Sequence, residues 1–211
     1  MKTVVAALAL LTASAALAQD DVVATAPAPA LSKVEAMTIQ SDDHIMGSAD
    51  AEHDLVAYVS VTCGHCRDWF NGEWPTVKSE LVETGKLRVA VRELPTSPAQ
   101  VSIAGFMVAN CAGEEAWFDN IEMQFERQDA TIKALSEGKG QEAFVKLATD
   151  SGLDGEEGLN ACLADDAQFA RIDQSIQRYE VTGAQGVPAF FLDGKPFTGA
   201  HKAADIAAAL D

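Results

Sequence analysis

The chain has 211 residues, with 32 acidic against 15 basic side chains and a formal net charge of −17. A surface this acidic repels nucleic acid, and the sequence contains no basic patch to offset the repulsion. We therefore predict no nucleic-acid partner. The chain is long enough for one well-cored domain, and nothing in its composition indicates two.

Residues 1–18 have the pattern of a secretory signal. A basic start at Lys2 precedes an almost unbroken apolar stretch from Val4 to Leu17, and small residues lead to a cut expected after Ala18. No later segment is apolar for long enough to cross a bilayer, so a soluble mature protein is expected, with an uncleaved anchor as the alternative. Export removes the cytosolic reductants, which favours disulfides.

Residues 19–42 are predicted to be a leader or linker. Ala, Val, Pro and acidic residues dominate from Gln19 to about Ala36, which is typical of a flexible or extended segment. Alternatively, the stretch from Leu31 to Met37 forms a short oligomerising helix, and the oligomeric state stays open. The folded domain is then expected over residues 43–211.

The motif Cys63-Gly64-His65-Cys66 follows the apolar run 55–61 and precedes a helical pattern. Cysteines three positions apart at a helix start share one face, so their sulfurs can bond with little backbone movement. Cys63 lies where unpaired N–H groups and the helix dipole favour its thiolate, and His65 adds a second donor. Cys63 is therefore the predicted nucleophile and Cys66 the resolving thiol.

A zinc site or an inert structural bridge would use the same motif. Zinc needs two more ligands, yet Cys111 and Cys162 stand alone, and no histidine pairs with another ligand at finger-like spacing. We therefore predict no metal and no other cofactor. Because Cys63 and Cys66 are adjacent, Cys111 and Cys162 are left to pair as a structural disulfide, with a second, electron-relaying redox pair as the alternative.

Two periodicities alternate along the first half of the domain. Residues 54–61 read as a buried strand and residues 86–94 as a second, parallel strand. Between them, residues 66–84 read as a helix kinked at Pro75. Its predicted inward stripe is Trp69, Phe70, Trp74, Val77 and Leu81. These elements form a right-handed strand–helix–strand unit.

Residues 98–182 show no strand pattern and predict an all-helical insert of five helices. Its aromatic residues fit helix cores better than a client-binding groove. After the insert, residues 186–192 read as a strand that opens with Pro188, followed by the turn Asp193-Gly194, a short strand and a closing helix over 201–210.

Together these features resemble the DsbA-like thiol oxidoreductases of bacterial envelopes over about residues 43–210. The resemblance implies an α/β thioredoxin-like fold in which the helical insert separates a βαβ half from a ββα half. It also implies that Pro188 is a cis-proline facing the disulfide and that the Val187 backbone pairs with client protein. The implied compartment is the periplasm.

Two residues depart from the family pattern. Proteins of this class often carry a buried acidic residue on the strand before the active site, where this chain has Ala57. Glu52, Asp54 and Glu93 are candidates to replace it, and the role stays unassigned. Gly64 stands where the best-known envelope oxidases carry proline and eukaryotic disulfide isomerases carry glycine, so the direction of electron flow stays open.

The predicted function is a protein disulfide oxidoreductase that introduces disulfides into exported proteins through a Cys63–Cys66 switch. The predicted site comprises Cys63, Gly64, His65, Cys66, Val187 and Pro188. The predicted partners are reduced, unfolded client proteins and a membrane redox partner that reoxidises the enzyme. The alternatives are a disulfide isomerase or reductase kept reduced by a membrane partner, and a thioredoxin-like binding or copper-handling module.

Overall fold

The computed structural model describes residues 31–210, so the predicted signal and residues 19–30 of the predicted leader lie outside the described residues. The strands are β1 (His44–Met46), β2 (His53–Val59), β3 (Leu87–Glu93), β4 (Ala189–Leu192) and β5 (Lys195–Pro196). The helices are α1 (Lys33–Met37), α2 (Gly64–Gly72), α3 (Trp74–Val77), α4 (Ala99–Ala112), α5 (Trp117–Glu126), α6 (Gln128–Ser136), α7 (Gly140–Asp150), α8 (Gly155–Leu163), α9 (Asp166–Thr182) and α10 (Ala203–Ala208).

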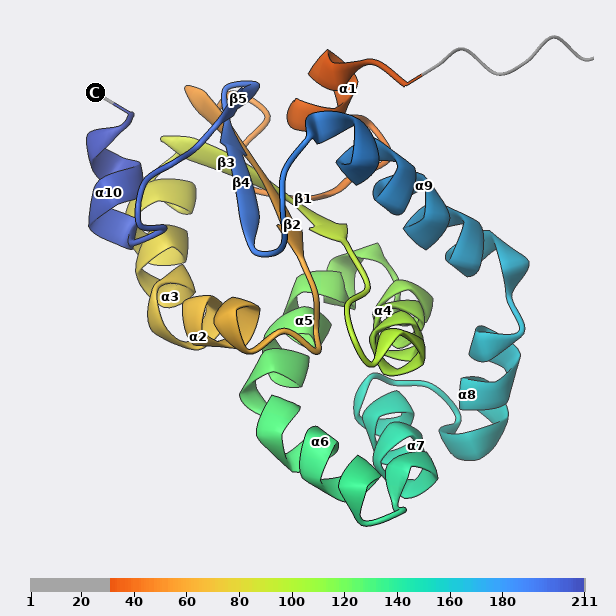
Figure 1. The fold of residues 1–211 in the computed structure, drawn as a ribbon. Helices are drawn as coiled ribbons and strands as arrows, with labels where there is room; N and C mark the ends of the chain where they lie inside the picture. Colours follow the sequence, from red (N-terminus) through yellow and green to blue (C-terminus); the bar gives the residue numbers. More distant parts are fainter. Residues whose placement is uncertain (1–30, 211) are drawn as a thin grey trace, which may run out of the picture. The chain divides into compact units, whose positions relative to one another are not determined.

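The strands form one mixed sheet in the order β1-β3-β2-β4-β5 (Figure 1). β2 and β3 are parallel, as expected for strands joined through a helix, and Leu55 lies opposite Val89. β4 pairs antiparallel with β2, so the C-terminal hairpin lies beside the strand that leads to the dithiol. β1, which sequence patterning does not predict, pairs antiparallel with β3.

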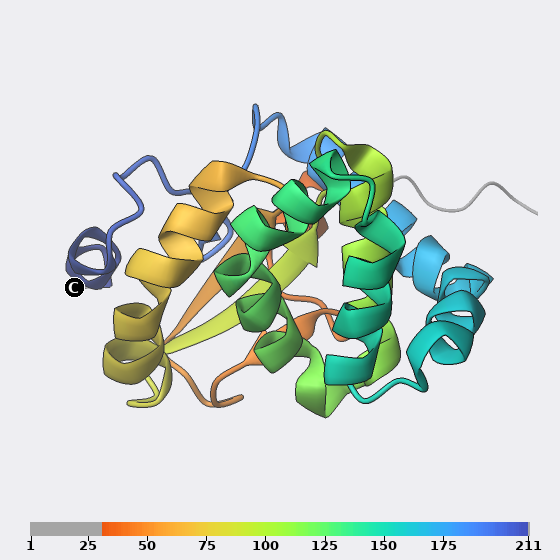
Figure 2. The same ribbon diagram turned by 90° about the horizontal axis from the view of Figure 1, so that it is seen from below.

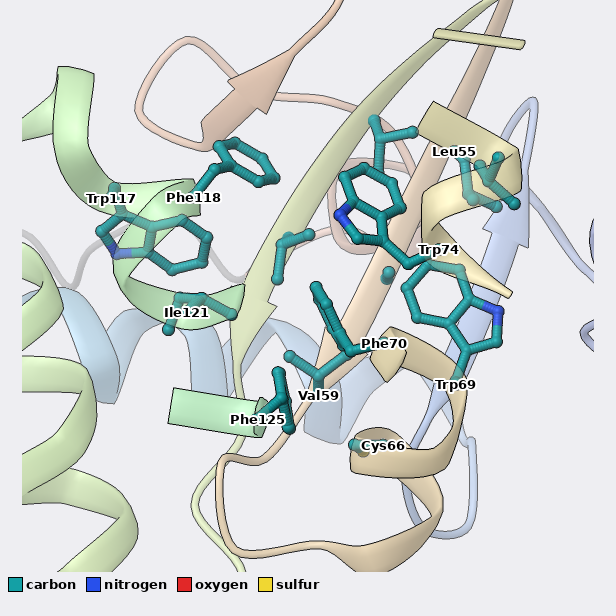
Figure 3. Packing of buried hydrophobic residues seen from close by; sticks show 14 of the residues in the cluster. Leu55, Val59, Cys66, Trp69, Phe70, Trp74, Trp117, Phe118, Ile121 and Phe125 are labelled. Carbon is teal, nitrogen blue, oxygen red and sulfur yellow. The ribbon is translucent and has the colours of Figure 1, made fainter. Parts of the chain in front are cut away.

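The side chains of β2 divide between the two faces of the sheet. Leu55, Ala57 and Val59 face the main core, where α2, α3, α4, α5 and α10 pack, whereas Val56 and Tyr58 face a smaller core beside α1 and α9. Figure 2 shows this face from the side on which α2, α3, α4 and α5 lie. Figure 3 shows the aromatic packing beneath them. All five residues of the inward stripe predicted for residues 66–84 are buried there.

The helix after the motif is interrupted rather than continuous. α2 ends at Gly72 and α3 restarts at Trp74, with Pro75 in its first turn, where its missing N–H costs no helical hydrogen bond. Residues 78–82 then form a π-helical turn. The predicted kink is therefore a one-residue interruption at Glu73, whose backbone angles stay in the right-handed helical region.

The helical insert contains six helices, α4 to α9, rather than the five predicted (Figures 1 and 2). The missed helix is α6, whose apolar residues Ile132 and Leu135 leave no buried stripe. Most aromatic residues of the insert are core, as predicted, but Phe169 is 49% exposed on α9. No helix within residues 31–210 is both long and apolar enough to cross a membrane.

Residues 31–42, which the sequence assigns to the leader, are part of the compact unit. Ser32 caps α1 through a capping box with Glu35, and Met37 is buried against the sheet. The buried Arg92 guanidinium on β3 donates to the carbonyls of Ala36 and Thr38. Asp43 forms an ion pair with Arg92 and balances its charge. These polar contacts hold residues 31–42 against the sheet.

Candidate active site

The dithiol lies where β2 passes into α2. The connecting loop, residues 60–63, ends at Cys63, which is the N-cap of α2 with extended backbone angles. The Cys63 N–H donates to Ser60 O at 3.0 Å, and the Cys63 carbonyl accepts the N–H of Arg67. A Cβ atom placed on Gly64 would meet no atom within 4 Å, so packing does not require glycine at that position.

The two thiols are unpaired with each other and differ in environment. Cys63 is half-buried, whereas Cys66 is fully buried among apolar side chains, as Figure 3 shows. A hydrogen bond from the Cys66 thiol, together with the N–H groups of Cys66 and His65 and the charge of His65, lowers the pKa of Cys63 to about 5 against the effect of burial. Cys63 is therefore a thiolate at neutral pH.

Burial raises the pKa of the Cys66 thiol strongly, and the neighbouring Cys63 sulfur raises it further. The opposing contact is the N–H of Ser60, 3.5 Å from Cys66 Sγ. The Ser60 hydroxyl lies within hydrogen-bond distance of Ser102 and Thr96, which fixes the end of β2 under the dithiol. Only Cys63 is thus ionised, which is the asymmetry a nucleophile and a resolving thiol need.

The segment around Pro188 faces Cys63 from the far end of the chain. The Val187–Pro188 peptide bond is cis, and the Val187 carbonyl oxygen lies 3.5 Å from Cys63 Sγ. Gly186 is bound through both backbone groups to the Tyr179 hydroxyl on α9. Sequence reasoning missed Tyr179, because nothing in its local pattern points to a loop seven residues away.

A cavity of about 480 Å³ opens beside the dithiol. Exposed His65, the cis-proline segment and the loop before α10 all contribute to its lining. Trp69, which is buried, also lines the cavity and donates its indole N–H to the carbonyl of His201. The lining residues are His65, Asp68, Trp69, Glu73, Val187, Pro188, Ala200, His201 and Lys202.

The candidates for the missing acidic role lie in different places. Ala57 is fully buried, Glu52 lies at the other end of β2, and Asp54 is paired with Arg88. Glu93 is buried, and its carboxylate Oε1 lies 3.6 Å from His44 Nε2. Burial alone would raise the Glu93 pKa, and the hydrogen bond and charge of His44 outweigh it and hold that pKa low. None of the groups that shift the Cys66 pKa is a carboxylate.

The second cysteine pair lies away from this turn, inside the helical insert. Cys111 at the end of α4 and Cys162 on α8 form a disulfide with an S–S distance of 2.08 Å and a Cα–Cα distance of 6.0 Å. It joins segments 51 residues apart. Within residues 31–210, no three His, Cys, Asp or Glu side chains gather as metal ligands would.

A thioredoxin fold with a reduced Cys-x-x-Cys at a helix start and a cis-proline against it defines a dithiol redox protein. The chain belongs to the thioredoxin family, whose profile matches residues 40–211. The α-DsbA1 structure from Wolbachia pipientis is similar with a TM-score of 0.74 at 20% identity, and the match covers 85% of this chain and 94% of that one. The predicted thioredoxin-like fold class is confirmed, and so is the DsbA-like resemblance.

Two curated relatives widen the comparison. A "Putative protein-disulfide oxidoreductase" of Rickettsia bellii is 26% identical over 82% of this chain and 65% of its own length. A protein of Herminiimonas arsenicoxydans named as the Na(+)/H(+) antiporter NhaA is 28% identical over 80% of this chain and 25% of its own length. The chain thus spans from a quarter to just under two thirds of these relatives.

Proposed function

We propose that this protein is a thiol:disulfide oxidoreductase that introduces disulfides into exported proteins in the bacterial periplasm. The observation that carries the proposal is the asymmetry between the Cys63 thiolate and the buried Cys66 thiol. A stabilised thiolate favours the dithiol form of the enzyme, which makes its disulfide an oxidant. The name of the Rickettsia relative supports the reaction class, and the signal pattern in residues 1–18 supports the compartment.

The reaction starts from the Cys63–Cys66 disulfide and a reduced, unfolded client. A client thiolate attacks Cys63 Sγ, which forms a mixed disulfide and breaks the bond to Cys66. Cys66 leaves with the electron pair and takes a proton, because burial disfavours its thiolate. A second client thiolate attacks the client sulfur of the bridge, and Cys63 leaves as the stabilised thiolate. The client is oxidised by two electrons, and a membrane redox partner reoxidises the enzyme.

The surface beside Cys63 supports binding of an extended client. The Val187 carbonyl lies next to the reacting sulfur, and Val187 also lines the cavity that Trp69 lines. Backbone pairing with an extended chain reads little sequence, so a broad client range follows. His65 on the rim stabilises the Cys63 thiolate as it leaves.

The testing experiment is the equilibrium of the Cys63–Cys66 pair against glutathione buffers, combined with melting temperatures of both redox states. We expect a potential far above that of thioredoxin, a reduced form more stable than the oxidised one, and oxidation of a reduced, unfolded ribonuclease. A low potential with a more stable oxidised form would overturn the oxidase assignment and leave an isomerase or reductase. Negligible client oxidation by the native protein, with copper binding that Cys63→Ser abolishes, would instead support the binding module.

A further inference from the structure

The loop that precedes Cys63 is held by a side chain from the helical insert. Gln128, the first residue of α6, points its side-chain amide at this loop. Its Nε2 donates to the carbonyl of Val61 at 2.8 Å and to the carbonyl of Cys63 at 3.1 Å. One amide group thus binds two carbonyls that flank Thr62.

The side-chain amide of Gln128 matches the two carbonyls of this contact. Gln128 is only 4% exposed and is the buried residue of α6. The NH₂ group carries two donors, which match the two acceptors. The Val61 carbonyl is buried, and leaving it without this donor would cost free energy, so the loop and the amide hold each other in one arrangement.

The Cys63 carbonyl is the point through which this contact reaches the sulfur. That carbonyl also accepts the Arg67 N–H and so starts the hydrogen-bond ladder of α2, while the Cys63 N–H is bound to Ser60 O. With both backbone groups fixed, the side chain of Cys63 projects over the start of α2. There the N–H groups of His65 and Cys66 act on Sγ.

We propose that Gln128 is a positioning residue for the redox reaction: its amide holds the Val61 and Cys63 carbonyls so that Cys63 Sγ stays over the N-terminus of α2. This inference rests on the proposed dithiol function and extends it to the helical insert. The insert then takes part in setting the reactivity of the nucleophile, through a side chain that is itself buried.

The first test replaces the amide with an apolar group of similar size. In Gln128→Leu the loop loses both donors, and we expect the Cys63 pKa to rise by about one unit, which is roughly a tenfold loss of thiolate at pH values below the pKa. The equilibrium with glutathione shifts toward the disulfide form by a similar factor. Both are measured on the whole mature protein, by thiolate absorbance against pH and by redox titration.

Graded variants separate positioning from stability. Gln128→Glu keeps the size but turns carboxylate oxygens toward the two carbonyls, so we expect a larger upward shift of the Cys63 pKa than with leucine. Gln128→Asn keeps the amide but is shorter by one methylene, so we expect a smaller shift. If the leucine variant does not fold, the asparagine variant carries the test, because it retains a donor.

Gln124 supplies the matched control, one turn earlier on α5. It is also buried, and its amide donates to Gly105 O at 2.9 Å and to Asn120 Oδ1, both inside the insert. Gln124→Leu should lower the melting temperature without moving the Cys63 titration. Gln128 variants that fold and titrate like the native protein would overturn the proposal, as would an equal shift in Gln124→Leu.

The titration needs no client, so it separates this inference from the proposed function. A native protein that fails to oxidise clients would refute the oxidase role, while the difference between Gln128 and Gln124 variants would still report on positioning. Conversely, normal client oxidation with an unmoved Cys63 pKa in every Gln128 variant would refute positioning alone.

Discussion

The two cysteine pairs of this chain occupy contrasting environments. Cys111 and Cys162 come from α4 and α8, lie 51 residues apart in sequence and are bonded. Cys63 and Cys66 lie within one turn of each other and are both free. One member of this second pair sits at a helix N-terminus near solvent, and the other is sealed in the core.

Both pairs are able to form a disulfide. The comparison shows that the surroundings of the sulfurs distinguish the redox-active pair from the structural disulfide. A bond between distant helices mainly restricts the unfolded chain, so its value is structural. At the helix start, opening the bond yields one stabilised thiolate and one protonated thiol, so reduction has a favourable product. The same residue type therefore gives two functions within one domain.

The largest effect should come from removing the nucleophile. In Cys63→Ser, oxidation of a reduced, unfolded protein should fall to the background of the buffer, because no mixed disulfide can form at that position. In Cys66→Ser the Cys63 thiolate can attack a disulfide of an oxidised client and release one client thiol, but no Cys66 thiol resolves the bridge, so client bound to Cys63 should accumulate, visible on non-reducing gels. If Cys63→Ser kept some turnover through the Cys111–Cys162 pair, that pair would be redox-active and not purely structural.

Next in size is the loss of the structural bond. The double variant Cys111→Ala, Cys162→Ala should lose about 4 kcal/mol of unfolding free energy, as expected for a closed loop of this length. Chemical denaturation of the oxidised protein measures it, with the Cys63 pKa as the internal control. A shift of that pKa in the double variant would show that the two pairs are coupled.

A smaller and pH-dependent effect distinguishes the redox states of the switch. Cys63 titrates near 5 when folded and reduced, against about 8.5 when unfolded. The thiolate therefore stabilises the reduced fold fully above about pH 8.5, progressively less toward lower pH, and not at all once the pH has fallen through about 5. The oxidised protein has no such thiolate and serves as the control. We expect the stability of the reduced form relative to the oxidised form to increase with pH across this window.

The fold and the motif can be predicted from the sequence alone because both depend on local residue patterns. A strand, a Cys-x-x-Cys and an amphipathic helix, followed by a Val-Pro strand and an Asp-Gly turn, each need only neighbouring residues. The turn shows this directly, since Asp193 and Gly194 both take positive φ, as the dipeptide predicts.

The features that escape prediction depend on distant partners. β1 is three residues long and exists through its pairing with β3. α6 lacks an apolar stripe because its buried side chain is the polar Gln128, which is turned to a loop 65 residues earlier in the chain. Residues 31–42 have the composition of a leader, but their carbonyls accept hydrogen bonds from the buried Arg92 side chain. Such contacts have no local signature.

The smallest effect should come from His65, whose charge is the least of the contributions that lower the Cys63 pKa. The imidazole is exposed at the cavity rim, so solvent and salt screen it. His65→Gln should raise the Cys63 pKa by a few tenths of a unit at low salt and by less at high salt. His53→Gln, a histidine paired with Asp193 at the other end of β2, should leave the titration unchanged. A shift in His65→Gln as large as that in Gln128→Leu would mean that the rim charge, and not the backbone geometry at the start of α2, dominates the thiolate. The low pKa of Cys63, which distinguishes the two cysteine pairs, would then depend mainly on one side chain and not on the fold around the start of α2.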